Sequence, residues 1–388
     1  MKNLTRQNFL RTTSLGLVAM AIAPHTWAVS AAAKQSPQTR IGAAWRRAVS
    51  ATNAQDYVGV MELDWDKQKI QVQTEHAVPT RAHGLMAEAS GGFLAIAARP
   101  GTWIRRFGPA GELVQHLSIE SESPSRTLAG HILYSQDGNW LYTTESDGKT
   151  QAGWVSVRNA KTLKKVAEWR SHGRDPHQCL LDSSGALMLV NGGILRDQNG
   201  QKRDLDQMNA SLVRMDGRTG ELLGRWHVND NRLSLRHMAW NHAPAGSQAL
   251  LGIAMQAEHD DVRTRRNAPV LALWDGKQIT IPCNDAIAAG YAGDIAAGPG
   301  GGFILSGQHA SKGVMWHPDE PEKLFTIAEL KNICALTIMD DVEKDKTVSK
   351  SVIMGSELGV AYWNPHHKPL MMGWPTALTL DNHWVILS

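Results

Sequence analysis

The sequence predicts an all-β protein: a seven-bladed β-propeller of four-stranded antiparallel blades, with the last blade closed by strands from both ends of the chain. Three observations predict this fold. A unit of strand, tight turn, strand, loop, strand, polar turn and strand recurs six times. The spacing of the copies suits propeller blades, and each end of the chain carries an incomplete unit.

The chain begins with a stretch that we interpret as an export signal and cleavage region, residues 1–33. Basic residues precede an apolar core from Leu15 to Ala23, and small residues follow it. The core is about half the roughly 20 residues that a membrane-spanning helix needs, and no later segment approaches that length. The segment TRQNFLR resembles the twin-arginine export motif, with Gln7 in place of the second arginine. We expect a periplasmic protein, exported by that route or the general secretory one, with no transmembrane segment in its mature chain.

Residues 34–54 are expected to be a linker and residues 55–388 the propeller. Small turns such as Asp137-Gly138 and Ser184-Gly185 separate β-rich runs, as tight hairpins require. The six units are separated by 48, 46, 60, 57 and 41 residues, against the roughly 40 to 50 of a four-stranded blade. They start at His83, His131, His177, His237, Asp294 and Ala335.

The two ends of the chain are expected to form the seventh blade together. Residues 376–388 would supply its first two strands, and residues 57–64 and 69–78 its last two. Closure of the ring removes open sheet edges, which invite aggregation. The structural alternatives are a stack of helical repeats, which lacks a sustained 3.6-residue apolar period here, and a two-domain β protein.

Charge and cysteine content exclude some classes of protein. Removal of the first 28 residues takes away three basic and no acidic residues, so 37 Lys and Arg balance 37 Asp and Glu. A nucleic-acid-binding surface is therefore poorly supported. The three cysteines form no C-x-x-C pair and are expected to be buried small apolar residues.

Motifs along nearly the whole chain, namely YVGVMELD, RAHG, GRDPHQ, RHMAWN and the C-terminal VILS, resemble a bacterial family of exported proteins known only as a domain of unknown function. Members of that family are often encoded beside imelysin-type iron-regulated proteins and a dihaem oxidoreductase-like protein. The resemblance implies a role in iron handling, with imelysin-like periplasmic proteins as candidate partners. It assigns no catalytic residues.

The histidines at the unit starts are the candidate metal ligands. The first strand of each propeller blade lines the central channel, so equivalent residues at its start ring one mouth. His83, His131, His177, His237 and Asp294 would converge there. Neutral imidazoles with a carboxylate suit iron, copper or zinc.

Two other interpretations of these histidines stay open. Arg81, Arg174 and Arg236 lie within three residues of unit-start histidines, and inward-pointing guanidinium groups would bind a carboxylate, a phosphate or a haem propionate instead. The histidines could also hydrogen-bond between blades with no ligand.

Two long polar loops are expected over the same mouth, at residues 196–210 and 257–269. Long loops on a rigid scaffold often carry recognition. Within the second loop, Glu258 and His259 are candidate ligand-binding residues. A solvated insertion without a partner is the alternative.

The sequence contains no G-x-S-x-G, H-E-x-x-H, P-loop or dinucleotide motif. We therefore expect a periplasmic, non-catalytic binding propeller that is accessory to iron acquisition and binds a metal, a haem-like ligand or a partner protein at the mouth. The alternatives are a metal-dependent enzyme that uses the same mouth, either a hydrolase or lactonase or a quinoprotein-like oxidoreductase, and a scaffold without a small ligand.

Overall fold

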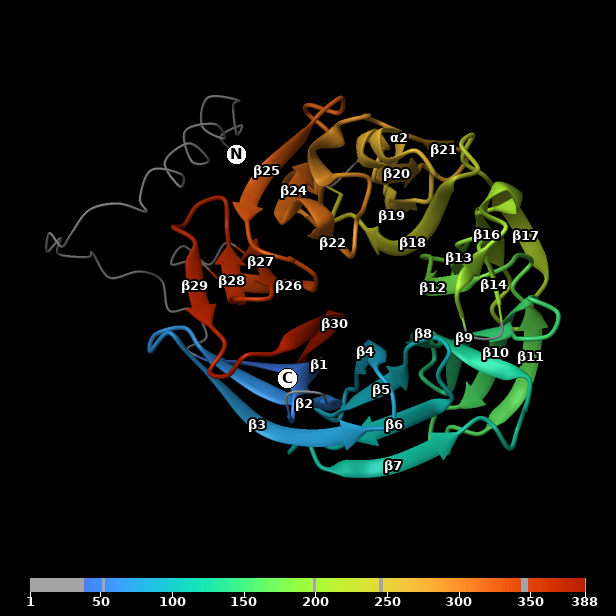
Figure 1. Cartoon of the computed structure of the whole chain (residues 1–388), viewed down its shortest axis with the longest axis horizontal. Helices are drawn as coiled ribbons and strands as arrows, with labels where there is room; N and C mark the ends of the chain where they lie inside the picture. The colour runs from blue at the N-terminus through green and yellow to red at the C-terminus, as the bar shows by residue number, and fades with distance from the viewer. Residues whose placement is uncertain (1–37, 51–52, 198–199, 244–246, 343–347, 388) are drawn as a thin grey trace, which may run out of the picture.

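Seven four-stranded antiparallel sheets stand around a central axis (Figure 1), which confirms the predicted propeller. The computed structural model describes residues 38–50, 53–197, 200–243, 247–342 and 348–387. The predicted export signal lies outside these residues. The seven innermost strands contact one another in a closed cycle, β4 to β8, β12, β18, β22, β26, β30 and back to β4.

Each sheet runs from an innermost strand to an outermost one. The first three complete blades are β4 (Ala82–Ala87), β5 (Phe93–Ala97), β6 (Trp103–Phe107) and β7 (Leu113–Ser118); β8 (Arg126–Tyr134), β9 (Trp140–Asp147), β10 (Gly153–Asn159) and β11 (Lys165–Arg170); and β12 (Pro176–Leu181), β13 (Leu187–Asn191), β16 (Ser211–Met215) and β17 (Leu222–Trp226).

Three further blades follow in chain order. They are β18 (Leu233–Trp240), β19 (Leu251–Ala257), β20 (Leu271–Trp274) and β21 (Ile279–Thr280); β22 (Ile295–Ala297), β23 (Phe303–Gly307), β24 (Lys312–Trp316) and β25 (Leu324–Glu329); and β26 (Leu336–Val342), β27 (Val348–Gly355), β28 (Gly359–Trp363) and β29 (Leu370–Gly373).

The closing blade combines both ends of the chain, but not in the predicted proportion. Its order is β30 (Thr379–Leu387), β1 (Gln38–Ala48), β2 (Ala54–Asp64) and β3 (Lys69–Val78). The C-terminal end therefore supplies one strand rather than two. Residues 34–54, expected to be a linker, contain β1, which is buried along most of its length and pairs with both β2 and β30. The propeller thus begins before residue 55.

The apolar core lies between successive sheets. One cluster joins Val58 and Val60 of the closing blade to Phe93 and Ile104 of the next blade, and similar clusters fill other gaps around the ring. The three cysteines are free and buried, as predicted. No helix among the described residues is long and apolar enough to cross a membrane.

Both long loops carry local structure. The first begins with a two-stranded hairpin, β14 (Leu195–Arg196) and β15 (Lys202–Arg203), followed by a 3-10 turn, η1 (Leu205–Gln207). The second contains a short helix, α2 (Val262–Asn267), whose first turn is capped by the Asp261 carboxylate, which accepts a hydrogen bond from Thr264 N. Three further 3-10 turns lie in later blades: η2 (Ala286–Ala288), η3 (Pro299–Gly301) and η4 (Gln308–Ala310).

Candidate metal centre and its cationic pocket

Five imidazole groups meet on the propeller axis, each from the innermost strand of a different blade. We call them the histidine ring: His83 (β4), His131 (β8), His177 (β12), His237 (β18) and His383 (β30). The centroids of neighbouring imidazoles lie 4.5 to 5.7 Å apart. The potential ligand atoms of the first four lie within 4.8 Å of one another. The structure therefore brings together all four predicted histidines and adds a fifth.

A β-bulge places each of these histidines. The pairing register of the innermost strand shifts at the histidine in all five blades: between Ala82 and Leu85, Leu128 and Ile132, Pro176 and Cys179, Leu235 and His237, and, in β30, between Leu380 and Trp384. A bulge inserts an extra residue and re-aims its side chain. The repeated irregularity turns the five imidazoles toward the axis.

Glycines allow the innermost strands β4 and β8 to lie close to each other at their bulges. A Cβ on Gly84 would lie 2.3 Å from the carbonyl oxygen of Gly130 in the next blade. Gly130 has a φ of +102°, and a Cβ there would lie 2.7 Å from Cδ2 of His83. Larger residues would therefore displace the β4 and β8 backbones or the His83 ring.

In two histidines of the ring, a carboxylate lies next to Nδ1, the nitrogen that faces away from the centre. Asp381 Oδ1 lies 3.0 Å from Nδ1 of His83, and Asp381 also pairs with Arg81. Burial opposes ionisation of Asp381, but Arg81 and His83 outweigh it and keep the pKa of this carboxyl below its usual range. A carboxylate at Nδ1 keeps the proton there, which leaves the Nε2 lone pair free to bind a metal.

Asp294, predicted as a ligand at the mouth, lies beside His383, and the potential ligand atoms of Asp294, His237 and His383 lie within 4.8 Å of one another. Its Oδ1 lies 3.4 Å from His383 Nδ1. The same carboxylate accepts hydrogen bonds from the backbone N–H groups of Ile295 and Leu336, each at 2.9 Å. Asp294 therefore joins two neighbouring blades and orients a ring histidine.

The nitrogens at the centre of the ring lack suitable partners. His237 Nε2 lies 2.9 Å from Nε2 of both His177 and His383. A neutral imidazole nitrogen carries either one proton or one lone pair, so it cannot serve both neighbours as a hydrogen-bond partner. Nε2 of His83 and of His131 are buried, and neither has a hydrogen-bond partner within the described structure.

Burial keeps four of these imidazoles neutral. It lowers the pKa of His83 to about 4, with nearby His383 and Arg81 acting in the same direction. Burial and the neighbouring histidines also place the pKa values of His131, His177 and His237 well below 6.5. At neutral pH His83, His131, His177 and His237 are therefore uncharged, the form of histidine that binds metal ions.

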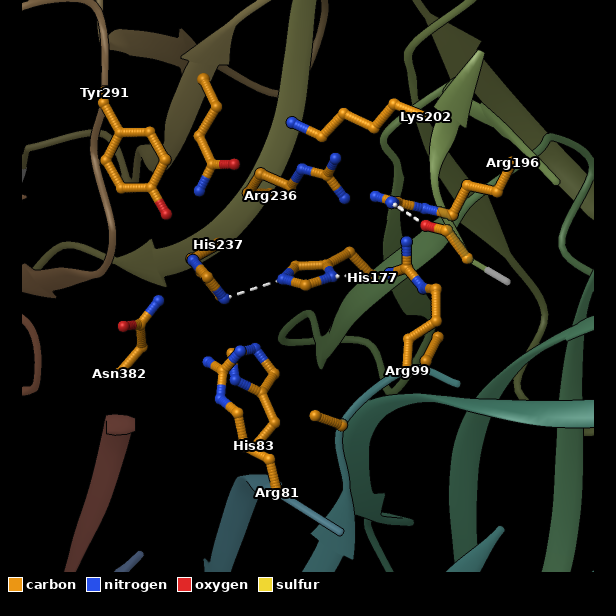
Figure 2. A pocket seen from close by; sticks show the side chains of 14 residues that line it. Arg81, His83, Arg99, His177, Arg196, Lys202, Arg236, His237, Tyr291 and Asn382 are labelled. Atoms are coloured by element: carbon orange, nitrogen blue, oxygen red, sulfur yellow. Dashed lines mark hydrogen bonds between the residues drawn. The ribbon is translucent and has the colours of Figure 1, made fainter. Parts of the chain in front are cut away.

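A pocket of about 300 Å³ opens onto the ring, with His83, His177 and His237 in its floor (Figure 2). Five cationic side chains line it: Arg81, Arg99, Arg196, Lys202 and Arg236. Tyr291, Asn382 and Gln256 complete the polar lining.

Three of these cations converge on one buried carboxylate. Asp175 accepts hydrogen bonds from Arg99, from Arg236 at 2.9 Å and from Arg196 at 3.4 Å. Arg99 Nη2 also donates to Nδ1 of His177 at 3.3 Å. Asp175 has a φ of +55°. Asp175 is buried, whereas Arg174, the residue before it, is exposed.

Three predicted ligand-binding residues lie outside this pocket. Arg174, expected to point inward, is exposed and lines a separate hollow with Arg170 and Arg225. Glu258 Oε1 accepts a hydrogen bond from Lys202 at 2.5 Å and so touches the pocket through that lysine. His259 Nε2 lies 3.0 Å from an oxygen of Asp230, and His259 does not line the pocket. Arg81 and Arg236, the other two predicted arginines, line the pocket.

The sequence interpretation missed His383, Asp381, Asp175 and Arg99, and did not single out Arg196 or Lys202 within the charged loop 196–210. His383 had a detectable signal, because the closing unit also needs an innermost strand and DNHWVIL contains its histidine. Arg99 follows the second strand of its blade and carried no motif.

Fold and site together define a class: a seven-bladed propeller with a buried histidine cluster on its axis beneath a cationic pocket. The sequence profile of a family described as "Protein of unknown function (DUF1513)" matches residues 76–387, and the chain belongs to this family. No curated protein matches the chain in sequence.

Solved propellers resemble the chain in fold. A mutant of an apocarotenoid oxygenase from Synechocystis superposes with a TM-score of 0.58 at 10% identity and covers 98% of each chain. A functionally unknown protein from Desulfotomaculum acetoxidans gives a TM-score of 0.53 at 9% identity, over 85% of this chain and 95% of its own. At these identities the likeness concerns the fold alone.

Proposed function

We propose that this protein is a metal-binding propeller that holds one divalent first-row transition ion in the histidine ring. The observation that carries the proposal is the convergence of five imidazoles. Among the described residues, Nε2 of His83 and of His131 has no partner, and Nε2 of His237 is shared by two neighbours. An ion that accepts several Nε2 lone pairs would remove this deficit. The carboxylates behind His83 and His383 are the groups that typically orient metal-binding histidines.

Iron(II) is the ion that we propose. Imidazole donors suit iron, nickel, copper and zinc. Among these ions, iron is the one that the sequence resemblance favours.

The biological role that we propose is that of an exported, periplasmic binding protein accessory to iron acquisition, with imelysin-like proteins as candidate partners. Support comes from the export-type N-terminal sequence and from the gene neighbourhood that the resemblance implies. A haem-like ligand fits less well, because about 300 Å³ lies at the small end of ligand pockets.

A metal-dependent enzyme is the second candidate, and one observation favours it. The pocket opens directly onto His83, His177 and His237, so a bound ion would face a space where a substrate could reach it. A metal in that position can act as a Lewis acid. Turnover of lactone, ester or quinol substrates by the iron-loaded protein, abolished in His83→Ala, would establish this alternative.

Metal content is the test of the proposed function. Full-length protein purified without oxygen or chelators should contain about one iron per chain by elemental analysis. His83→Ala and His237→Ala should each lower that content severalfold or more. His367→Ala is the matched control, since this histidine is exposed at an outer turn and should leave the content unchanged.

Circular dichroism and thermal unfolding would show that the variants fold. A protein that contains no transition metal after native purification, and takes up neither iron, nickel, copper nor zinc after chelation, would overturn the proposal. Stoichiometric zinc alone would reject iron but retain a metal centre.

A further inference from the structure

We infer that the pocket above the histidine ring binds a small organic dicarboxylate. The inference goes beyond metal binding, because the anion-binding groups are distinct from the ring and require no metal. Only the position of the ligand next to an ion rests on the proposed function.

The first argument is an imbalance of charge. The five cations Arg81, Arg99, Arg196, Lys202 and Arg236 line one pocket. Their acidic partners within the described structure are three: Asp381 for Arg81, Asp175 for three arginines, and Glu258 for Lys202. The group therefore has two positive charges in excess, which a dianion would neutralise.

The second argument is that three of these cations, Arg99, Arg196 and Arg236, are largely buried around the same carboxylate, with side chains 11%, 19% and 4% exposed. Burial, together with the charge of Arg236, lowers the pKa of Arg196 to about 10. Burial also lowers the pKa values of Arg99 and Arg236, and nearby arginines add to the effect at Arg99. Close, buried like charges oppose one another, so an anion among them is favoured.

The third argument is the presence of unused donors. Nε of Arg236 and Nε of Arg99 are buried and have no hydrogen-bond partner in the described part of the chain. The Arg236 side chain is only 4% exposed. Guanidinium groups held this rigidly bind carboxylates through paired hydrogen bonds.

The distribution of the cations favours two carboxylates over one compact oxyanion. Figure 2 shows Arg196 and Lys202 on one side of the pocket and Arg81 on the other, with His177 and His237 between. Each end of an extended dianion would then meet a cation. A volume of about 300 Å³ suits a short-chain acid. With an ion in the ring, one carboxylate would also lie close enough to bind that ion.

The experiment uses chelator-treated full-length protein, which separates this inference from the metal proposal. Succinate is the probe, succinamide its neutral analogue, and phosphate the compact oxyanion, all at equal ionic strength. Succinate at millimolar concentration should raise the melting temperature and give a saturable isothermal titration. Succinamide should do neither, and phosphate should bind at least about tenfold more weakly.

Variants identify the site. Arg196→Gln with Lys202→Gln should weaken succinate binding about tenfold or more. Arg174→Gln, in the neighbouring hollow, is the control and should bind as the unchanged protein does. Arg236→Gln is a second variant, read together with circular dichroism because it also removes a partner of Asp175.

Three results would overturn the inference: no succinate binding by correctly folded metal-free protein, phosphate binding as tight as succinate binding, or equal loss of binding in Arg174→Gln. Succinate binding without any metal uptake would support this inference while the metal proposal failed. Metal uptake without succinate binding would do the reverse.

Discussion

At the scale of single residues, the pair of Asp381 and His83 best distinguishes a metal centre from a packing arrangement. The carboxylate keeps the His83 proton on Nδ1, 3.0 Å away, and so directs the Nε2 lone pair inward. Asp381→Asn should lower the affinity for iron(II) by about 10- to 100-fold, as for other partners of metal-binding histidines. Competition with a chromophoric chelator would measure the change.

Asp56→Asn is the control for that prediction. Asp56 pairs with Arg46 in the closing blade, at 2.8 Å, and is not a partner of the ring. This variant should keep its metal affinity even if it loses some stability. Unchanged affinity in Asp381→Asn, together with a large loss of stability, would show that Asp381 serves packing instead.

His177 should contribute less to metal binding than the other predicted ligands. Arg99 donates to its Nδ1, so the neutral ring carries its proton on Nε2. The inward atom of His177 is then a donor rather than a lone pair. We expect His177→Gln to reduce iron affinity less than His131→Gln does, measured by the same chelator competition. A larger loss in His177→Gln would mean that metal binding shifts this proton.

Sequence reasoning reached four ring residues because the repeat aligned them, although they are 46 to 60 residues apart from one copy to the next. It could not identify Asp381 or Asp175, because aspartates occur near strands for many structural reasons and carry no specific signal. Only three-dimensional packing shows that Asp381 meets His83 across 298 positions of sequence. His383 was missed for a different reason, the expected division of residues 376–388 into two strands.

At the scale of the element, the bulge of each innermost strand sets the direction of its histidine. Gly130 lies in the bulge of β8, with a φ of +102°, and faces the His83 ring. Gly130→Ala should destabilise the protein by about 1–3 kcal/mol, since it combines backbone strain with a steric clash. It should also weaken iron binding, because His83 must move. Urea unfolding and chelator competition would measure the two effects.

Gly138→Ala separates strain from the clash. Gly138 has a φ of +70°, and a Cβ there would meet nothing within 4 Å. This variant should show a stability loss from backbone strain and normal iron binding. If both glycine variants bind iron normally, the close approach of β4 and β8 does not position His83.

The strands themselves were largely predictable and the bulges were not. Tight turns separate apolar runs in most blades, and these signals are local. A bulge looks like ordinary strand sequence, because its extra residue is recognised only against the partner strand. β1 was mistaken for a linker since its sequence, QTRIGAAWRRA, combines small and basic residues without a clear alternation. Its burial between β2 and β30 explains the small residues.

At the scale of the whole molecule, one strand both closes the propeller and completes the histidine ring. β30 pairs with β1, contacts β4 and β26 on either side, and carries Asp381 and His383. Closure of the propeller and assembly of the histidine ring are therefore coupled. The cations above the ring come from three blades, so the pocket also depends on the relative placement of blades rather than on any single one.

Truncation after Leu378 should therefore remove the fold, whereas His383→Ala should remove only a ligand. Without β30, the inner edge of β1 is unpaired and the closed cycle of innermost strands is broken, which exposes apolar surface and favours aggregation. We expect the truncated chain to lose cooperative thermal unfolding. His383→Ala should unfold cooperatively within a few degrees of the unchanged protein but bind iron more weakly.

A synthetic peptide of residues 376–388 added to the truncated chain should restore both cooperative unfolding and iron binding. The same peptide with alanine at position 383 should restore cooperative unfolding alone. A truncated chain that unfolds cooperatively by itself would show that the other six blades need no closure.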